Sequence, residues 1–332
     1  MALITHLVHA AVIGAALELA AAGAAAQPAL ARSQGYPNKP IRWIVPFAPG
    51  AAADILSRAI TQKLTESWGQ QIVIDFRPGA GGSLGTQIAA GAAPDGYTVI
   101  LVPASFASSP SLYSKPPYDP VKDFAPVTLV AASPLILVVH PSMPVTSVKE
   151  LVALAKARPG ELNYASSGIG VGNHLAAELF KSMKGVNIFH VPYKGNAPAL
   201  IDLMGGQIHM MFPNAPSALP HIKAGKLRAL AVTTLRRSAL LPELPTLAES
   251  GLPGFEANNW AGLVAPAGTP QAIIGKLHSE VVRSVKLPDV HQRLVNLGFE
   301  PTGNTSQEFA AYIRTEIATW NKVIRAAGIR AD

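Results

Sequence analysis

Short apolar runs alternate with helix-period segments along the chain, and this alternation occurs twice. In the first copy, the run 41–47 is followed by a Pro-Gly pair at 49–50, and residues 55–64 then carry apolar side chains at helical spacing. A second run, 72–74, enters the Gly-rich loop 77–83, and a third strand is predicted at 97–102. Because strands alternate with helices, this copy predicts a mixed, mostly parallel sheet flanked by helices.

The second copy repeats the order with little sequence identity to the first. The strand predicted at 162–165 leads into the loop 166–170, which is rich in Ser and Gly. The strand 188–191, the loop 192–196 and the strand 208–212 follow, with helical patterns between them. Two copies of one order predict two similar α/β lobes.

Two further strands are predicted to connect the lobes. The run 135–139 carries the chain into the second lobe, and 260–265 returns it. We therefore expect lobe one to comprise residues 36–132 plus 264–332, and lobe two residues 133–263.

The C-terminal part of the chain has helical signals. Thr269 and Pro270 predict one helix start, Thr305 with Glu308 forms a capping box for another helix, and Gly328 predicts its end.

The N-terminus carries the pattern of an export signal. Residues 10–26 are almost wholly apolar and too short to span a bilayer, and small residues that suit a signal peptidase follow. Glu18 interrupts the run, and His6 and His9 stand where Lys or Arg is usual. We expect residues 1–31 to be a cleaved signal peptide and the mature protein to be periplasmic.

The amino-acid composition excludes several classes of functional site. The 332 residues contain no Cys, which excludes disulfide scaffolds, thiol catalysis and cysteine-ligated metals. The net charge is +7, but Lys and Arg are scattered singly without interleaved aromatic residues, so an anionic small solute is favoured over nucleic acid. No P-loop or H-E-x-x-H motif is present, and we expect neither cofactor nor metal.

The candidate site lies at the carboxyl ends of the predicted strands. In open α/β sheets, loops and helix N-termini at that edge present N–H groups to anions. If the two lobes face each other, these loops line one ligand cleft. The predicted ligand-binding residues are Phe47, Gly50, Ala51, Asp54, Gly81, Ser83, Ser105, Ser166, Ser167, Gly168, His174, Tyr193, Gly195 and Asn214.

Several of these side chains also have structural interpretations. An acid such as Asp54 is favoured in a helical first turn by the macrodipole, with or without a ligand. A lone histidine such as His174 is more often packed than functional. Ser166 and Ser167 suit either a carboxylate or the helix that follows them.

Eight segments of the chain resemble the Bug (Bordetella uptake) family. The resemblance covers nearly all of the mature chain, and its segments are 45–50 with Asp54, 77–82, 94–98, 166–170 with His174, 191–195, 216–228, 245–246 with Glu249, and 260–266. It implies the two-lobed, type II-like periplasmic-binding-protein fold, hinge closure, and a role as the substrate-binding component of a tripartite tricarboxylate transporter. The implied partners are a small carboxylate and a membrane permease, and we expect a monomer.

Two departures from the family pattern bear on the ligand. Family members usually have Gly-Gly after the proline at position 49, whereas this chain has Gly50 and Ala51. Members that bind amino acids carry an acid where this chain has Pro213 and Asn214. The resemblance therefore implies a simple mono- or dicarboxylate, aromatic ones included, rather than a ligand with an ammonium group.

Two other functional classes remain open from the sequence. A ligand-binding sensor that docks on a membrane sensor kinase would have the same binding chemistry. A hydrolytic enzyme is the rival class, since Ser166 or Ser167 with His174 offers a nucleophile and a base. No G-x-S-x-G elbow is present, however, so we expect no enzyme.

Overall fold

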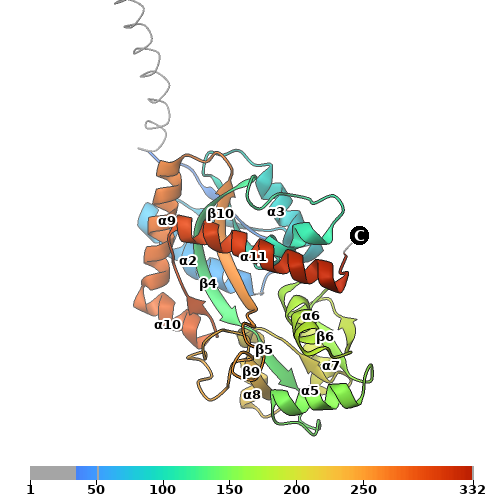
Figure 1. The fold of residues 1–332 in the computed structure, drawn as a ribbon. Helices are drawn as coiled ribbons and strands as arrows, with labels where there is room; N and C mark the ends of the chain where they lie inside the picture. Colours follow the sequence, from blue (N-terminus) through green and yellow to red (C-terminus); the bar gives the residue numbers. More distant parts are fainter. Residues whose placement is uncertain (1–34, 51, 331–332) are drawn as a thin grey trace, which may run out of the picture.

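Two sheets divide the chain into an upper and a lower α/β lobe (Figure 1). The computed structural model describes residues 35–50 and 52–330. The predicted signal peptide, residues 1–31, and the predicted contact at Ala51 lie outside the described residues. The expectation of a two-lobed α/β fold is confirmed.

The sheet of lobe one has the strand order β11-β4-β10-β3-β1-β2. β1 pairs in parallel with β2 and β3, whereas β10 runs antiparallel to β3 and β4. β1, β2, β3 and β4 therefore all point the same way. The strand bounds are β1 Ile41–Val45, β2 Ile72–Phe76, β3 Thr98–Pro103, β4 Phe124–Pro134, β10 Asn258–Pro266 and β11 Glu300–Pro301.

The sheet of lobe two has the order β7-β6-β8-β5-β9. β6 pairs in parallel with β7 and β8, and β5 runs antiparallel to β8 and β9. The carboxyl ends of β6, β7 and β8 therefore lie at one edge. The strand bounds are β5 Ile136–Val139, β6 Asn163–Ser166, β7 Phe189–Pro192, β8 Met210–Met211 and β9 Arg228–Val232.

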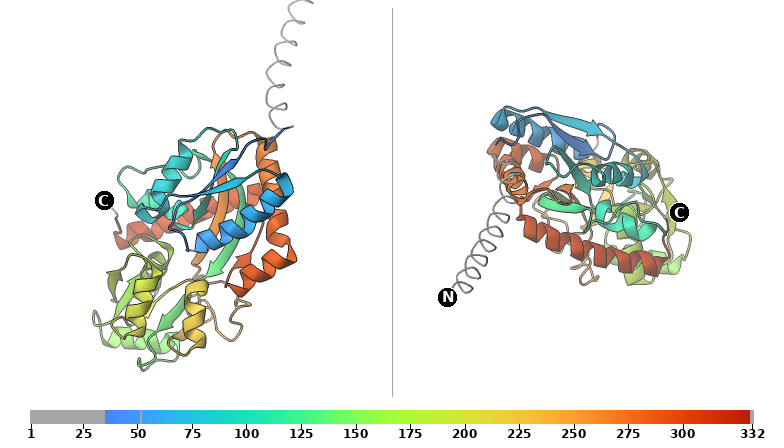
Figure 2. Two further views of the ribbon diagram at one scale, coloured as in Figure 1. Left: turned by 180° about the vertical axis from the view of Figure 1, so that it is seen from behind. Right: turned by 90° about the horizontal axis from the view of Figure 1, so that it is seen from above.

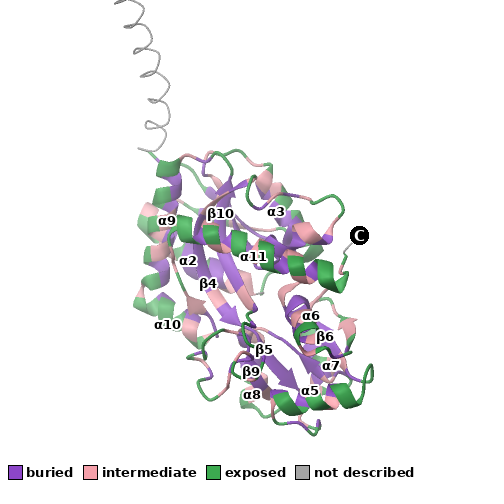
Figure 3. Cartoon of the chain, viewed as in Figure 1, coloured by how far each residue is buried: buried purple, intermediate pink, exposed green. Residues whose placement is uncertain are grey.

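Helices cover both faces of each sheet, with their exposed sides outward (Figures 2 and 3). Lobe one contains α2 Ala52–Trp68, α3 Ser83–Ala90, α4 Ser105–Ser108, α9 Gln271–Lys286 and α10 Pro288–Asn296, with the short 3-10 turns η1 Ala80–Gly82 and η2 Ser109–Leu112. Lobe two contains α5 Val148–Ala157, α6 Gly172–Lys184, α7 Asn196–Met204 and α8 Ala215–Lys223. The long C-terminal helix is α11 Ser306–Ala327.

Successive side chains of β1 point alternately into the two core layers of lobe one. Trp43 and Val45 pack with α2 and α9 on one face, and Ile44 packs with α11 on the other. A strand that is buried on both faces explains why the segment reads as a continuous apolar run. The indole N–H of Trp43 is satisfied by Ser57 Oγ of α2 at 2.9 Å, which allows the ring to be fully buried.

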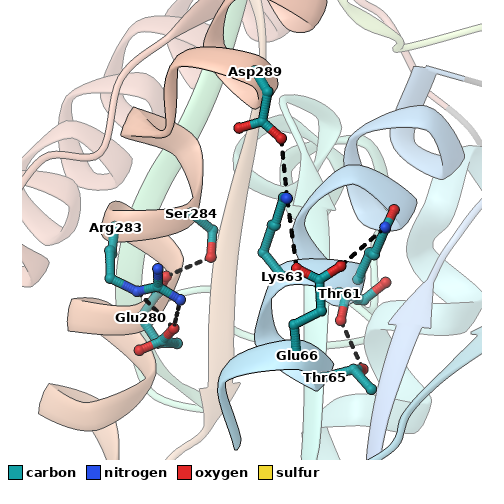
Figure 4. A network of polar contacts seen from close by, with 9 residues as sticks. Thr61, Lys63, Thr65, Glu66, Glu280, Arg283, Ser284 and Asp289 are labelled. Atoms are coloured by element: carbon teal, nitrogen blue, oxygen red, sulfur yellow. Dashed lines mark hydrogen bonds and ion pairs between the residues drawn. The ribbon is translucent and has the colours of Figure 1, made fainter.

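An ion pair fastens two helices on the α2 side of this sheet (Figure 4). Lys63 Nζ of α2 lies 3.0 Å from Asp289 Oδ2 in the first turn of α10 and 3.5 Å from Glu66 Oε2. Because Asp289 stands at a helix N-terminus, the macrodipole supports its negative charge as well.

The two lobes are joined by β4, β10 and α11. β4 and β10 pair along their lengths, and the predicted lobe boundaries, 132/133 and 263/264, fall inside these two strands. The predicted capping box at Thr305 is present, and Gly328 ends α11 with a φ of 64°. The helix was predicted to return to lobe one, but Trp320 and Ile324 near its C-terminus pack in the core of lobe two.

A half-buried carboxylate lies in the middle of α11. Glu316 Oε2 accepts the indole N–H of Trp260 at 2.7 Å and that of Trp320 at 3.0 Å. Trp260 belongs to β10 and the core of lobe one, whereas Trp320 belongs to the core of lobe two. One side chain of α11 therefore bonds to groups in both cores.

Candidate functional site

The predicted site loops lie at the carboxyl ends of β1, β2 and β3 in lobe one and of β6, β7 and β8 in lobe two. They meet where the lobes touch. A Cβ placed on Gly81 would lie 3.9 Å from Val171 Cγ1, and Ser108 Oγ donates to the carbonyl of Gly170 at 3.4 Å. The structure therefore brings the first turn after β2 and the loop after β6 together.

The loop after β1 is held by the acid that follows it. The N–H of Gly50 donates to Asp54 Oδ2 at 2.8 Å, and Arg58 Nε forms an ion pair with Asp54 Oδ1 at 2.7 Å. Asp54 is buried, whereas Gly50 is exposed and has a φ of 84°. The carboxylate of Asp54 thus fixes the turn that presents Gly50, and this position requires the left-handed conformation that glycine tolerates.

The loop after β2 folds into a tight turn before α3. Ser105 Oγ at the start of α4 donates to the carbonyl of Gly81 at 2.7 Å, which ties this turn to the end of β3. Ser83 is buried at the first position of α3, close to the hydroxyl of Tyr118. Phe47 is half-buried, and a Cβ on Gly82 would lie 3.7 Å from its Cζ. These predicted residues therefore form one cluster.

In lobe two, an asparagine that the sequence interpretation did not single out joins two loops. Asn173 Oδ1 accepts from both the N–H and the Oγ of Ser167 at 3.2 Å. Its Nδ2 donates to Asn196 Oδ1 at 3.0 Å, and the N–H of Gly195 donates to the carbonyl of Ser167 at 3.2 Å. The only sequence signal was an amide residue in the first turn of a helix that follows a Gly-rich loop.

His174 lies in a stack of three rings behind the β6–α6 loop, residues 167–171. Its Nδ1 accepts the N–H of Gly170 at 2.9 Å, and its ring lies 4.0 Å from that of His190, which in turn stacks on Tyr164. Burial, the neighbouring His190 and Lys181 lower the pKa of His174 to about 3. His190, which sequence reasoning missed, has its pKa lowered to about 4, chiefly by burial. Both imidazoles are therefore neutral at neutral pH.

The hydroxyl of Ser166, the last residue of β6, is bonded to the loop that follows it. Ser166 Oγ donates to the carbonyl of Gly168 at 2.9 Å and lies 2.6 Å from His190 Nε2. The side chain has no exposed surface. A serine and a histidine at this distance resemble a nucleophile and its base, but a hydroxyl without solvent access cannot reach a substrate. The geometry therefore favours loop support over catalysis.

The two remaining predicted side chains also have partners within lobe two. The hydroxyl of Tyr193 donates to Asp202 Oδ2 at 2.6 Å, and burial together with this carboxylate raises the pKa of Tyr193 to about 12. Asn214 Oδ1 caps α8 by accepting the N–H of Ser217 at 3.1 Å. Both residues lie at the predicted edge of the sheet, and their side chains stabilise its loops.

Three helices at this junction begin without a side-chain cap. α3 begins after Gly82, α6 after Val171 and α7 after Gly195, and none of these residues provides a capping hydrogen bond. The first N–H groups of a helix have no partner within the helix and carry the positive end of its dipole. One such end in lobe one and two in lobe two suit a ligand with negative charge.

The described residues show neither a metal site nor a membrane helix. No group of three or more His, Asp or Glu side chains within them has the geometry to hold a metal ion. No helix in the same range combines the length and apolar character that a bilayer span requires.

Comparisons with known proteins agree with this architecture. A sequence model of the tripartite tricarboxylate transporter family receptors matches residues 56–329. BugT of Bordetella pertussis is 39% identical over 297 residues, which cover 89% of this chain and 91% of BugT.

Two solved structures are similar along nearly their whole length. An R. palustris protein solved with adipate is 41% identical, with a TM-score of 0.81 and coverage of 89% of this chain and 99% of that protein. MatC from Rhodopseudomonas palustris, solved with bound malate, is 33% identical, with a TM-score of 0.78 and coverage of 87% and 100%.

Proposed function

Because this chain belongs to the family of tripartite tricarboxylate transporter receptors, and is thus a periplasmic solute-binding protein, we propose that its ligand is an aliphatic dicarboxylate. The proposed size range extends from malate to adipate, the ligands of two similar proteins. The receptor binds this diacid between its lobes and delivers it to the membrane components of a tripartite transporter.

The observation that carries the proposal is the arrangement of uncapped helix N-termini on both lobes. α3 begins next to Gly81, which faces Val171, the residue that precedes α6. A dicarboxylate has two separated negative ends, so one carboxylate can accept N–H groups from lobe one and the other from lobe two. Hydrogen bonds to a charged group contribute about 1.5–3 kcal/mol each.

Backbone groups are the proposed direct contacts. The N–H groups of Gly81 and of the first turn of α3 serve lobe one, and those at the starts of α6 and α7 serve lobe two. Phe47 lies beside Gly82 and supplies apolar surface for the methylene chain. Asp54, Ser166 and His174 have partners within the protein, and we assign them the role of shaping the loops.

Export and transport complete the proposal. Residues 1–31 act as the cleaved signal peptide, and the mature monomer works in the periplasm without cofactor, metal or catalysis. Ligand binding favours the arrangement in which the two lobes close about the hinge strands β4 and β10. The closed receptor then docks on the permease.

Calorimetric titration of the mature chain, from Arg32 onward, tests the proposal. The series comprises malate, succinate, glutarate and adipate, with hexanoate as the monoacid control and adipamide as the uncharged control. We expect binding of at least one diacid, weaker binding of hexanoate and none of adipamide. Adipamide binding as tight as that of adipate, or no binding of any diacid, would refute a dicarboxylate receptor.

A further inference from the structure

We propose that His174 and His190 form a positioning pair that holds the β6–α6 loop in the conformation required for ligand binding. This inference rests on the proposed function, because it concerns the same site. His174 contacts the loop directly and His190 contacts it through Ser166, and neither ring is proposed to contact the ligand. The two rings come from different elements, α6 and β7, so neither belongs to the loop that they hold.

The pair is built on the sheet of lobe two. Tyr164 and His190 are register partners on the parallel strands β6 and β7, and their rings stack at 4.8 Å with an interplanar angle of 16°. α6 places His174 against His190 at 4.0 Å and 15°. The stack lies next to the loop, because its rings come from β6, which leads into the loop, from α6, which follows the loop, and from β7, the neighbour of β6.

His174 fixes one peptide group of the loop directly, and His190 acts on another through the hydroxyl of Ser166. The N–H of Gly170 donates to His174 Nδ1, so this nitrogen is unprotonated. Ser166 Oγ donates its single hydrogen to the carbonyl of Gly168 and accepts the N–H of Gly168 at 3.3 Å. His190 Nε2, at 2.6 Å, must then donate to Ser166 Oγ. The loop thus requires an acceptor on one ring and a donor on the other.

The surroundings keep both rings neutral. Two imidazolium ions at this separation would repel each other, and burial disfavours either charge. Glu178 is the facing acid, but its Oε1 accepts the hydroxyl of Tyr164 at 2.5 Å and lies 2.6 Å from Lys181 Nζ. The ammonium of Lys181 opposes protonation of both histidines.

The loop needs such support because its glycine residues allow many backbone conformations. Gly168 and Gly170 both have positive φ values, 147° and 74°. Without an external anchor, a glycine-rich segment has to be ordered when the ligand binds, and this entropy reduces affinity. Two anchors, made by the buried ring of His174 and the half-buried ring of His190, order the loop in advance, so their loss reduces affinity more than it reduces folding stability.

Paired variants at each histidine test the inference. In H174N, the amide oxygen replaces Nδ1 as the acceptor, whereas H174L removes it. In H190Q, the amide nitrogen replaces Nε2 as the donor, whereas H190F keeps a stacked ring without a donor. Calorimetry with adipate and malate, thermal unfolding, and amide hydrogen exchange at Gly168 and Gly170 are measured on the mature chain.

We expect H174L and H190F to raise the Kd about tenfold or more, the effect of one lost hydrogen bond, while H174N and H190Q stay within about threefold of the wild type. Without ligand, H174L should accelerate amide exchange at Gly170, and H190F should accelerate it at Gly168. Unchanged exchange in both, or equal affinity losses in all four variants, would overturn the positioning role. If the wild type binds no diacid, the proposed function fails, and exchange still decides whether the rings hold the loop.

Discussion

The contact between Gly170 and Leu112 offers a sharp test of how the lobes fit together. Leu112 belongs to η2 of lobe one, yet it is 4% exposed and packs in the hydrophobic core of lobe two. Gly170 has a φ of 74°, and a Cβ placed on it would lie 2.0 Å from Leu112 Cδ1. Gly170→Ala therefore introduces a methyl group where a side chain of the other lobe already lies.

The expected magnitude has two parts. The left-handed conformation disfavours alanine relative to glycine by about 1–2 kcal/mol. The overlap with Leu112 adds about 1–3 kcal/mol of overpacking, so Gly170→Ala should reduce the free energy of unfolding by about 2–5 kcal/mol. Leu112→Ala alone should cost a similar amount, about 2–5 kcal/mol, through the cavity that it leaves.

The double variant distinguishes overlap from backbone strain. The new methyl group of G170A partly fills the space vacated in L112A, so the two losses should fall short of additivity by about 1–3 kcal/mol. Urea unfolding of the wild type, both single variants and the double variant measures this coupling. G225A is the matched control, since Gly225 has a φ of 68° and a Cβ on it meets nothing within 4 Å. Additive losses, or a G170A variant as stable as G225A, would refute the packing argument.

Three further predictions concern polar groups that are buried or half-buried. Asn173→Ala should raise the Kd for the diacid about tenfold, because both loops of lobe two lose a shared hydrogen-bonding partner, and calorimetry measures this change. Burial raises the pKa of Glu316 above 4.5, so its contribution to stability falls as pH rises past that value, and Glu316→Gln should flatten this part of a pH series of urea unfolding curves. The pKa values of His174 and His190 are lowered from 6.5 to about 3 and about 4, so the folding stability that these residues contribute falls as the pH drops below 6.5. The double variant H174N/H190Q should lose this part of the pH dependence, which the same urea series measures.

Much of the fold could be predicted because its strands are short apolar runs that end in glycine-rich loops. β1, β3 and β6 lie within one or two residues of the predicted ranges, and the capping box at Thr305 is present. β4 was missed because residues 124–139 form one nearly continuous apolar stretch, which the structure divides between the sheets of the two lobes. Periodicity cannot locate such a division when both strands are buried on both faces.

The candidate site was predictable at the level of loops but not of side-chain partners. The rule that ligands bind at the carboxyl ends of parallel strands needs only the order of elements. The role of His174 depends on His190, which reaches it only through the pairing of β6 with β7. Asn173 likewise meets Asn196 across two loops, 23 residues apart in the chain. Such contacts follow from tertiary register, which local sequence does not encode.

We propose that uncapped helix N-termini on both lobes bind the two ends of a dicarboxylate. A crystal structure of the mature chain with adipate, or with whichever diacid binds most tightly, tests it most directly. We predict one carboxylate at the start of α3 and the other at the starts of α6 and α7, each bonded to backbone N–H groups directly or through one water. A diacid bound away from these helix ends, or contacting a single lobe, would contradict the account.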